Sequence, residues 1–194
     1  MTKMRIYPRS SGRSNGFTLI ELMVVIALIA IITTMAVPSW QRMIVSNRIR
    51  ASVNDLTLSI QFARSETLRQ NGPVTVCPSS DGVNCTASGY EAGWMVKTGL
   101  PAVAATDRIL QDTLPKQRLT MVADATTVAA GGLTFLPNGA LIGTFPQGVR
   151  IAVKDDPATD TTLERYICIA RTGRVRVLTR DLYVVLLPGE CGPP

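Results

Sequence analysis

The chain of 194 residues contains no histidine, and only 5% of its residues are aromatic. Because histidine is the commonest general base and the commonest metal ligand, its absence excludes Ser–His and Cys–His hydrolases and histidine-ligated zinc sites. Charged residues are also scarce at 18%, whereas 46% of the sequence is hydrophobic, and this composition excludes a strongly disordered chain. No acid–base pair is apparent either, since Asp155 and Asp156 fall in an expected loop. We therefore expect neither enzymatic activity nor a cofactor.

The positive charge of the chain is concentrated at its start. Lys and Arg total 20 against 14 Asp and Glu, which gives a net charge of +6. Lys3, Arg5, Arg9 and Arg13 all precede Gly16, with no acidic residue among them, and the rest of the chain carries a net charge of only +2. The chain is therefore not basic throughout.

A long apolar run follows this basic segment. Residues Phe17–Val37 contain a single charge, Glu21. As a helix they would rise about 31 Å, which is close to the thickness of the hydrocarbon core of a bilayer. The preceding basic residues predict a cytoplasmic N-terminus. A secretory signal peptide is the alternative, but its apolar region would be shorter, about 7–15 residues, and would end at a cleavage site between small residues.

Glu21 needs an explanation because a carboxylate inside a membrane costs several kcal/mol. Thr18 and Glu21 have the spacing of a capping box, which would satisfy free amides in the first turn of a helix. The helix macrodipole would also favour an acid at this end. Neither account requires a second protein.

The six residues Gly16-Phe17-Thr18-Leu19-Ile20-Glu21, after a basic leader, resemble the processing site of type IV prepilins and pseudopilins. This resemblance implies that a prepilin peptidase in the membrane cuts after Gly16 and methylates Phe17. It also implies that Glu21 pairs with the terminal amine of a neighbouring subunit, which would offset the cost of burying the carboxylate. Pro38 lies where this family commonly has a helix-bending proline.

Helical periodicity continues beyond Pro38 and ends at Gln70-Asn71-Gly72-Pro73. The proline cannot donate a hydrogen bond to the carbonyl of Thr34, so we expect the helix to bend or loosen there. An apolar face in the second half predicts packing against a globular core. The expected members of this face are Ile44, Val53, Leu56, Ile60, Ala63 and Leu68.

Short runs of strand-like sequence, separated by turn residues, occupy the rest of the chain. Their spacing of about ten residues favours antiparallel sheet. Pro137-Asn138-Gly139 is typical of a hairpin turn. The expected strands are Val74–Cys77, Gly93–Lys97, Arg108–Leu114, Arg118–Val122, Leu133–Leu136, Ala140–Thr144, Val149–Lys154, Arg165–Ala170, Arg174–Leu178 and Leu182–Leu187.

Several segments in this order resemble the FimT/GspH group of minor pilins and pseudopilins. They are Phe62–Arg69, Gly72–Cys77, Gly93-Trp94, and Leu133–Phe135 with Pro137-Asn138-Gly139. The resemblance implies an α+β, type IV pilin-like fold, in which a long N-terminal helix packs on antiparallel sheet. We expect a leader (1–16), a transmembrane and assembly helix (17–37), an amphipathic continuation (38–72) and a periplasmic β-rich domain (73–194).

Four cysteines, Cys77, Cys85, Cys168 and Cys191, allow three disulfide pairings. The expected topology places them outside the cytoplasm, where oxidation is favoured. Cys77 and Cys85 bracket a loop rich in Gly, Ser and Asn, so local closure would leave Cys168 to hold the tail at Cys191. A four-cysteine zinc site is the alternative, but no C-x-x-C pair is present.

Arginine is concentrated near the C-terminus, where residues 165–180 contain five arginines and no acid. Arg171-Thr172-Gly173 would turn the chain between two strands, and alternation would direct Arg174 and Arg176 outward and Val175 and Val177 inward. Arg171 would lie near the turn and Arg180 further along. Such a row can contact successive phosphates. The alternatives are a solvated edge strand and ion pairs of these arginines with Asp181 or with acids of residues 155–164.

Gly173-Arg174-Val175-Arg176 matches the GRxR motif of FimT-type minor pilins, which bind DNA for natural transformation. The resemblance therefore implies a minor type IV pilin that is anchored in the inner membrane, assembles with other pilin subunits and binds the DNA backbone. The alternative is a GspH- or FimU-like subunit with a purely structural role in a type II secretion pseudopilus or at a pilus tip.

Overall fold

The computed structural model describes residues 16–86, 89–101, 108–113, 118–123, 131–142, 149–155 and 160–185. The chain divides into two compact units, Met1–Arg42 and Met43–Pro194. The boundary falls within the first helix, so each unit contains part of it.

Helix α1 spans 52 residues, Leu19–Gln70, and continues through Pro38. It begins two residues after the expected Phe17 because Thr18 caps it: the backbone N–H of Glu21 donates to the Thr18 hydroxyl at 3.2 Å. Of the two hydrogen bonds that make up a capping box, the one between the Thr18 hydroxyl and the backbone N–H of Glu21 is thus present. At the other end the helix stops where predicted, and Asn71 takes a positive φ of 52°.

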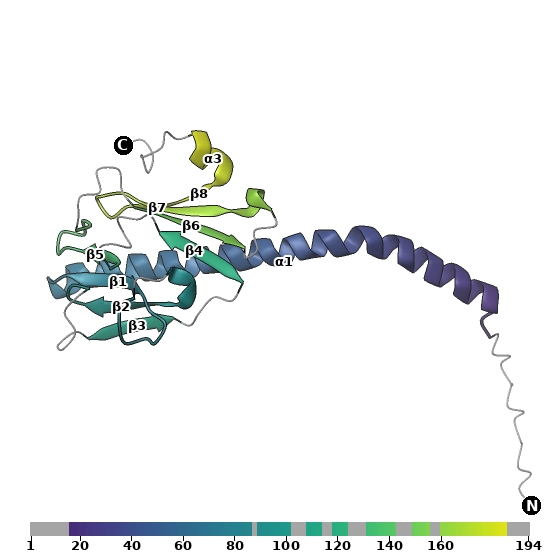
Figure 1. Ribbon diagram of the computed structural model, residues 1–194, viewed down its shortest axis with the longest axis horizontal. Helices are drawn as coiled ribbons and strands as arrows, with labels where there is room; N and C mark the ends of the chain where they lie inside the picture. The colour runs from purple at the N-terminus through teal and green to yellow at the C-terminus, as the bar shows by residue number, and fades with distance from the viewer. Residues whose placement is uncertain are drawn as a thin grey trace, which may run out of the picture. The chain divides into compact units, whose positions relative to one another are not determined.

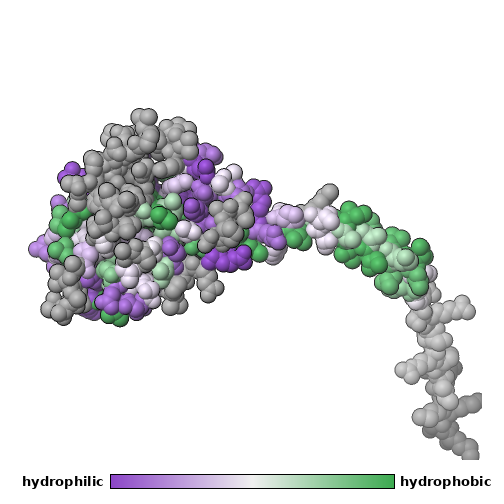
Figure 2. Space-filling view, in the orientation of Figure 1, coloured by the Kyte–Doolittle hydropathy of each residue, from purple (hydrophilic) through white to green (hydrophobic). Residues whose placement is uncertain are grey.

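In the first unit the apolar stretch of the helix is uncovered, with 0% of it buried. Its large side chains are exposed, including Leu19, Leu22, Ile26 and Ile29. Figure 2 shows a hydrophobic surface over the N-terminal part of α1. The helix contains a stretch with a mean hydropathy of 2.6, long and apolar enough to cross a membrane. Such a surface requires lipid or other apolar helices around it.

The second unit contains two four-stranded antiparallel sheets (Figure 1). The first has the order β3-β2-β1-β5, with β1 Val74–Pro78, β2 Trp94–Thr98, β3 Ile109–Thr113 and β5 Leu133–Phe135. The second has the order β4-β6-β7-β8, with β4 Leu119–Ala123, β6 Val149–Asp155, β7 Arg165–Ile169 and β8 Val175–Thr179. Short helices η1 (Tyr90–Ala92), η2 (Thr161–Leu163) and α3 (Arg180–Val185) complete the described elements.

One face of α1 and the inner faces of both sheets form a single core. Ile49, Val53, Leu56, Ile60 and Ala63 are at most 2% exposed, so the amphipathic second half of the helix packs as predicted. Where the helix meets the first sheet, the Trp94 indole N–H donates to the Ser59 hydroxyl at 2.9 Å. The α+β, type IV pilin-like fold class expected from the sequence is therefore confirmed.

Four expectations about local structure were wrong. Asp155, expected in a loop, is the last residue of β6 and lies 3.3 Å from the guanidinium group of Arg48. Ile44 and Leu68 are exposed rather than part of the core, because at 3.6 residues per turn both lie about 100° or more from the middle of the buried stripe. The described part of the expected strand Leu182–Leu187 is helical and belongs to α3. A short apolar run alone does not distinguish a strand from a helix, and here Asp181 in the first turn favours the helix. Of the expected strand Ala140–Thr144, Leu141 forms an isolated bridge to Phe135, and residues 143 and 144 lie outside the described residues.

The packing of the core predicts that two leucines close together on α1 contribute very differently to the free energy of unfolding. Leu56 is fully buried, whereas Leu58 is 62% exposed. Leu56→Ala should lower the free energy of unfolding by about 2–5 kcal/mol, because it leaves a cavity in the core that both sheets share. Leu58→Ala should change it by no more than about 0.5 kcal/mol. Urea denaturation followed by tryptophan fluorescence measures both, and equal losses would contradict this packing.

Candidate functional site

The arginine-rich segment forms a tight hairpin between β7 and β8. Ile169 pairs with Val175, and the N–H of Ala170 donates to the carbonyl of Arg174 at 2.8 Å. The N–H of Gly173 donates back to the Ala170 carbonyl at 2.8 Å, and Gly173 has a φ of +79°. This is a three-residue loop that ends on a glycine in the left-handed region. The predicted turn is present, with Arg174 just before β8 rather than on it.

A second turn of the same kind lies beside the first. The N–H of Leu136 donates to the carbonyl of Ala140 at 2.8 Å, the N–H of Gly139 donates to the Leu136 carbonyl at 2.7 Å, and Gly139 has a φ of +75°. The N–H of Leu141 then donates to the Arg171 carbonyl at 3.0 Å, which joins the two turns. The turn after β5 of the first sheet thus contacts the β7–β8 turn of the second.

Arg64 of α1 reaches into the junction between these turns. Its Nη2 donates to the Thr172 carbonyl at 3.1 Å, and its Nε is buried with no hydrogen-bond partner among the described residues. A Cβ on Gly173 would lie 2.2 Å from the Gly139 carbonyl oxygen and 2.9 Å from Arg64 Nε. A Cβ on Gly139 would lie 3.1 Å from the same Nε. Close packing and positive φ therefore both require glycine at 173.

Arg64 is a residue that the sequence did not indicate as part of the site. It does not belong to the apolar face expected for the helix, and its partner Thr172 is 108 residues distant in sequence. The available signal was the repeat of a three-residue turn ending in glycine, Pro137-Asn138-Gly139 and Arg171-Thr172-Gly173. Two such turns allow close approach of other groups, but the sequence does not say which group approaches.

The predicted arginines fall into two groups. The first group is Arg171 and Arg174, which are exposed, and Arg176, which is partly exposed. Among the described residues, no ion pair or side-chain hydrogen bond is found for these three arginines. Arg176 pairs in register with buried Cys168, so it lies on the sheet face opposite Val175, as alternation predicts. Val177, expected to point inward, pairs in register with the core residue Ile167, but it is 45% exposed because β8 ends the order of its sheet.

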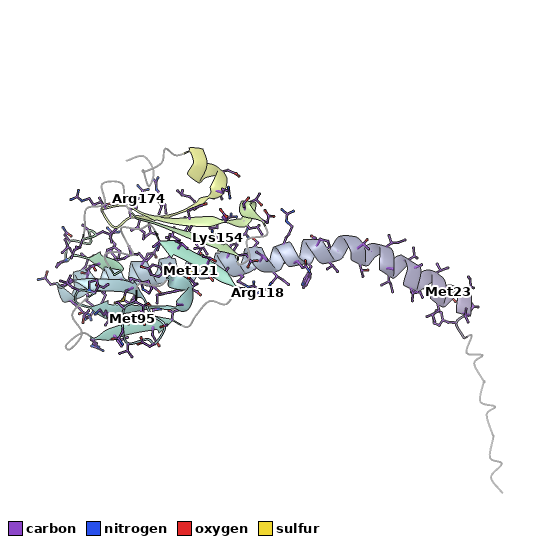
Figure 3. All side chains as sticks on the ribbon, in the orientation of Figure 1. Met23, Met95, Arg118, Met121, Lys154 and Arg174 are labelled. Carbon is purple, nitrogen blue, oxygen red and sulfur yellow. A yellow bond between two sulfur atoms is a disulfide. The ribbon has the colours of Figure 1, made fainter. Side chains whose placement is uncertain are left out.

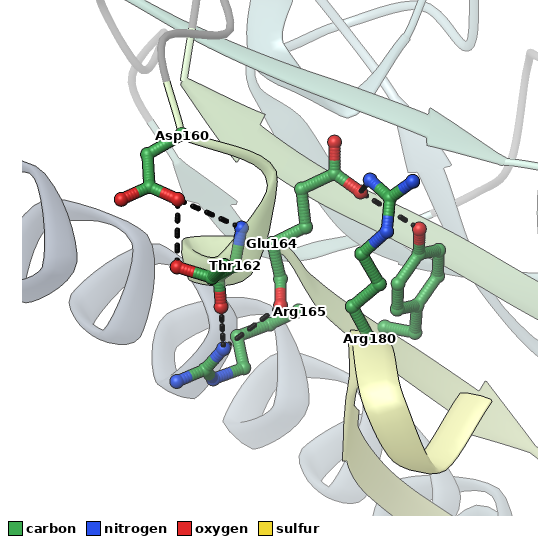
Figure 4. Close-up of polar contacts among 6 residues, drawn as sticks. Asp160, Thr162, Glu164, Arg165 and Arg180 are labelled. Atoms are coloured by element: carbon green, nitrogen blue, oxygen red, sulfur yellow. Dashed lines mark hydrogen bonds and ion pairs between the residues drawn. The ribbon is translucent and has the colours of Figure 1, made fainter. Parts of the chain in front are cut away.

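Arg180 belongs to a different environment, shown in Figure 4. Its Nη1 lies 3.0 Å from Oε2 of Glu164, and the Tyr166 hydroxyl donates to the same carboxylate oxygen at 2.9 Å. Next to it, Arg165 donates to the backbone carbonyls of Thr162 and Glu164. The pairing of Arg180 with an acid of the 155–164 segment is one of the alternatives considered from the sequence, and it leaves this guanidinium partly neutralised.

A groove of about 550 Å³ lies between α1 and the start of β8. Its helix side is formed by Gln61, Arg64, Ser65 and Leu68, and its other side by Gly173, Arg174 and Val175. Figure 3 shows Arg174 at the β7–β8 turn. The groove therefore combines two arginines from different elements with a small apolar surface.

The acid nearest in sequence to Arg64 has other partners. Hydrogen bonds from Arg69 and Gln70 hold the pKa of Glu66 at about 2, well below its usual value. Side chains two residues apart on a helix do not face each other, so Glu66 does not oppose Arg64 directly. Within the lining of the groove there is no acidic residue.

Cys77 and Cys85 form a disulfide, with 5.5 Å between their Cα atoms. The loop they close is organised by Asp81, whose pKa is held below its usual range by the backbone N–H groups of Asn84 and Val83. Cys168 is also disulfide-bonded, and Cys191 lies outside the described residues. No group of three or more potential metal ligands occurs in the described part of the chain.

At the other end of the chain, Gly16, Phe17 and Glu21 are all exposed, and Phe17 has 86% of its surface accessible. Glu21 lies in the first turn of α1, in the unit that carries the uncovered apolar helix. Cleavage after Gly16, methylation of Phe17 and a pairing role for Glu21 stay predictions.

Comparison with known families agrees with this architecture. The family described as type II transport protein GspH matches residues 52–173, which is more than half of the chain. The chain belongs to the GspH family. A second family, the prokaryotic N-terminal methylation motif, matches residues 11–37. The protein is therefore a minor pilin or pseudopilin of the type IV pilus and type II secretion systems, structural rather than enzymatic, with the motif of subunits that prepilin peptidase processes before assembly with other pilins.

Individual relatives are more distant. The chain is 41% identical over 71 residues to the fimbrial protein EcpB of Eikenella corrodens, a match that covers 37% of this chain and 44% of that protein. It is similar in structure to the type IV minor pilin FimU of Pseudomonas aeruginosa. One crystal form superposes with a TM-score of 0.53 and 21% identity over 68% of this chain and 89% of FimU. Another crystal form superposes with a TM-score of 0.50 and 22% identity, over 66% of this chain and 91% of FimU. At this identity the likeness shows the fold alone.

The contact between the turns predicts that the glycine of the GRxR sequence is needed for folding, apart from any binding. Gly173→Ala should lower the free energy of unfolding by roughly 2 kcal/mol or more, because the new methyl group meets Gly139 and Arg64 at a positive φ. Gly72→Ala is the matched control, since its Cβ would meet nothing closer than 3.9 Å. Thermal unfolding by circular dichroism compares the two, and equal stability would contradict the packing described.

Proposed function

We propose that this protein is a structural subunit that enters a pilus or pseudopilus through the apolar half of α1. The observation that carries this proposal is the exposed apolar helix with a lone carboxylate at its start. Before assembly the bilayer covers that helix, with the N-terminus in the cytoplasm and the second unit in the periplasm. Prepilin peptidase then removes residues 1–16 and methylates Phe17. Residues 17–37 form the assembly helix, 38–72 its amphipathic continuation and 73–194 the β-rich domain.

In this proposal Glu21 specifies assembly rather than folding. Once Phe17 is the first residue, its amine carries the charge that a neighbouring Glu21 can neutralise in an apolar surrounding. The capping bond uses the backbone N–H of Glu21 and the Thr18 hydroxyl, so it leaves the carboxylate available. The cost of an unpaired carboxylate among helices gives the subunit a reason to adopt one register with its neighbour.

Glu21→Gln should therefore be inserted in the membrane and cleaved after Gly16, but should be lost from filaments sheared from cells. The control is Asp181→Asn, which removes one negative charge from an exposed site of the second unit. Mass spectrometry of the membrane fraction measures cleavage, and immunoblotting of the sheared fraction measures incorporation. Incorporation of Glu21→Gln at the wild-type level would contradict the role of the carboxylate.

A second candidate function is binding of DNA through the β7–β8 turn. It is favoured by Arg171, Arg174 and Arg176, which lack acidic partners in the described part of the chain, and by the match of Gly173–Arg176 to GRxR. Contacts of this kind are directed to phosphates, so binding would be salt-sensitive and poorly selective for sequence. Arg180 would contribute less, because its guanidinium already pairs with Glu164.

Arg174→Gln combined with Arg176→Gln should weaken retardation of duplex DNA in gels. The slope of log K against log salt should also become shallower, by the amount that about two phosphate contacts contribute. The matched control, Arg50→Gln with Arg118→Gln, removes two exposed positive charges elsewhere in the second unit. Filaments should persist in both variants. If the two double variants bind DNA equally, or if filaments disappear only in the first, the protein has a purely structural role.

A further inference from the structure

We infer that the groove between α1 and the β7–β8 turn is a binding site for a backbone phosphate of nucleic acid, and that Arg64 contacts this phosphate together with Arg174. The inference rests on the DNA-binding candidate above and adds to it a residue and a location. Neither the helix side of the groove nor Arg64 belongs to the arginine turn that the sequence indicates.

The position of Arg64 is fixed before any ligand arrives. Its hydrogen bond to the Thr172 carbonyl and the packing of its Nε against Gly139 and Gly173 hold the guanidinium group in place. A guanidinium has five N–H groups, so this contact leaves further donors at the groove. A side chain held in this way loses little conformational entropy when it binds an anion.

The composition of the groove favours an anion. Arg64 and Arg174 line it from opposite elements, and the polar side chains of Gln61 and Ser65 line it beside them, with no acid among the lining residues. Guanidinium groups bind phosphate oxygens through paired N–H donors, and two of them can share one phosphate. Leu68 and Val175 provide apolar surface in the same groove, which suits the sugar that follows each phosphate.

The surroundings favour a nucleic acid over an acidic segment of another subunit. Arg171 is exposed in the same turn, and Arg176 is two residues beyond Arg174. Positive charge therefore continues from the groove to the rest of the turn through Arg171, and onto the outer face of β8 through Arg176. A polymer with one negative charge on every unit matches such a row, whereas a single acidic side chain would occupy only the groove.

Gln61 offers a test that leaves every arginine in place. It is exposed on the helix side of the groove, and Gln61→Glu places a carboxylate one turn before Arg64 without changing the size of the side chain. The matched control is Asn54→Asp, the same change at an exposed position two turns earlier on that helix face and about 10 Å away along the axis. Both should unfold at the wild-type temperature.

The full-length processed protein in non-ionic detergent is titrated against a fluorescent 20-base-pair duplex over a salt series. Gln61→Glu should weaken binding about eightfold at 0.1 M salt, the scale of one lost phosphate contact, and should reduce the slope of log K against log salt by about 0.9. Asn54→Asp should change neither by more than about twofold. Gln61→Lys should tighten binding and raise the slope, and Asn54→Lys should do so less.

The outcomes separate this inference from the proposal beneath it. If Arg174→Gln weakens binding but Gln61→Glu behaves as Asn54→Asp does, the turn binds DNA and the groove does not. If Gln61→Glu leaves DNA binding unchanged but reduces incorporation into filaments, the groove holds an acidic segment of another subunit, and the inference is wrong. If the wild-type protein binds no DNA, both the inference and the DNA-binding candidate fail.

Discussion

The structure depends on the burial of one face of α1. Ile49, Val53, Leu56, Ile60 and Ala63 close a core to which both sheets contribute. The same core contains inner-face residues of both sheets and Tyr90 of η1, so removing this stripe would uncover apolar surface on each sheet. The first half of the same helix buries nothing within its own unit, so its apolar surface is available to membrane or neighbouring subunits. One continuous helix thus forms part of the core in its second half and exposes an apolar surface in its first.

The same constraint positions the candidate binding site. Because α1 is fixed by its buried face, Arg64 on its flank lies at a fixed place between the two glycine-ended turns. Gly173 is then required for packing, which gives the glycine of GRxR a structural reason that does not depend on DNA. The arginines differ from it: Arg171, Arg174 and Arg176 have no ion-pair partner among the described residues and contribute nothing evident to the core. Within one motif, the glycine therefore has a role in packing, whereas the adjacent arginines are the residues that the proposed binding of DNA would use.

Local signals in the sequence predicted much of this fold, and long-range contacts account for most of what they missed. The apolar run, the stop at Gln70–Pro73 and the turn at Pro137–Gly139 each depend on neighbouring residues, and all appear in the structure. The helix α3 was mistaken for a strand because six residues are too few to establish a period. Arg64 was missed because its contact with Thr172 spans most of the second unit, and the pairing of Arg180 with Glu164 was only one of several open alternatives. Family membership supports the structural role most directly, and the DNA-binding role depends on the exposed arginines.

The central claim, that α1 makes the two sheets one cooperative unit, is tested most directly by native-state hydrogen exchange on the Leu56→Ala variant. The account predicts that amides of β2 in the first sheet and β7 in the second lose protection by the same free energy, because both sheets depend on one helix face. A loss of protection confined to one sheet, with the other unchanged, would contradict it.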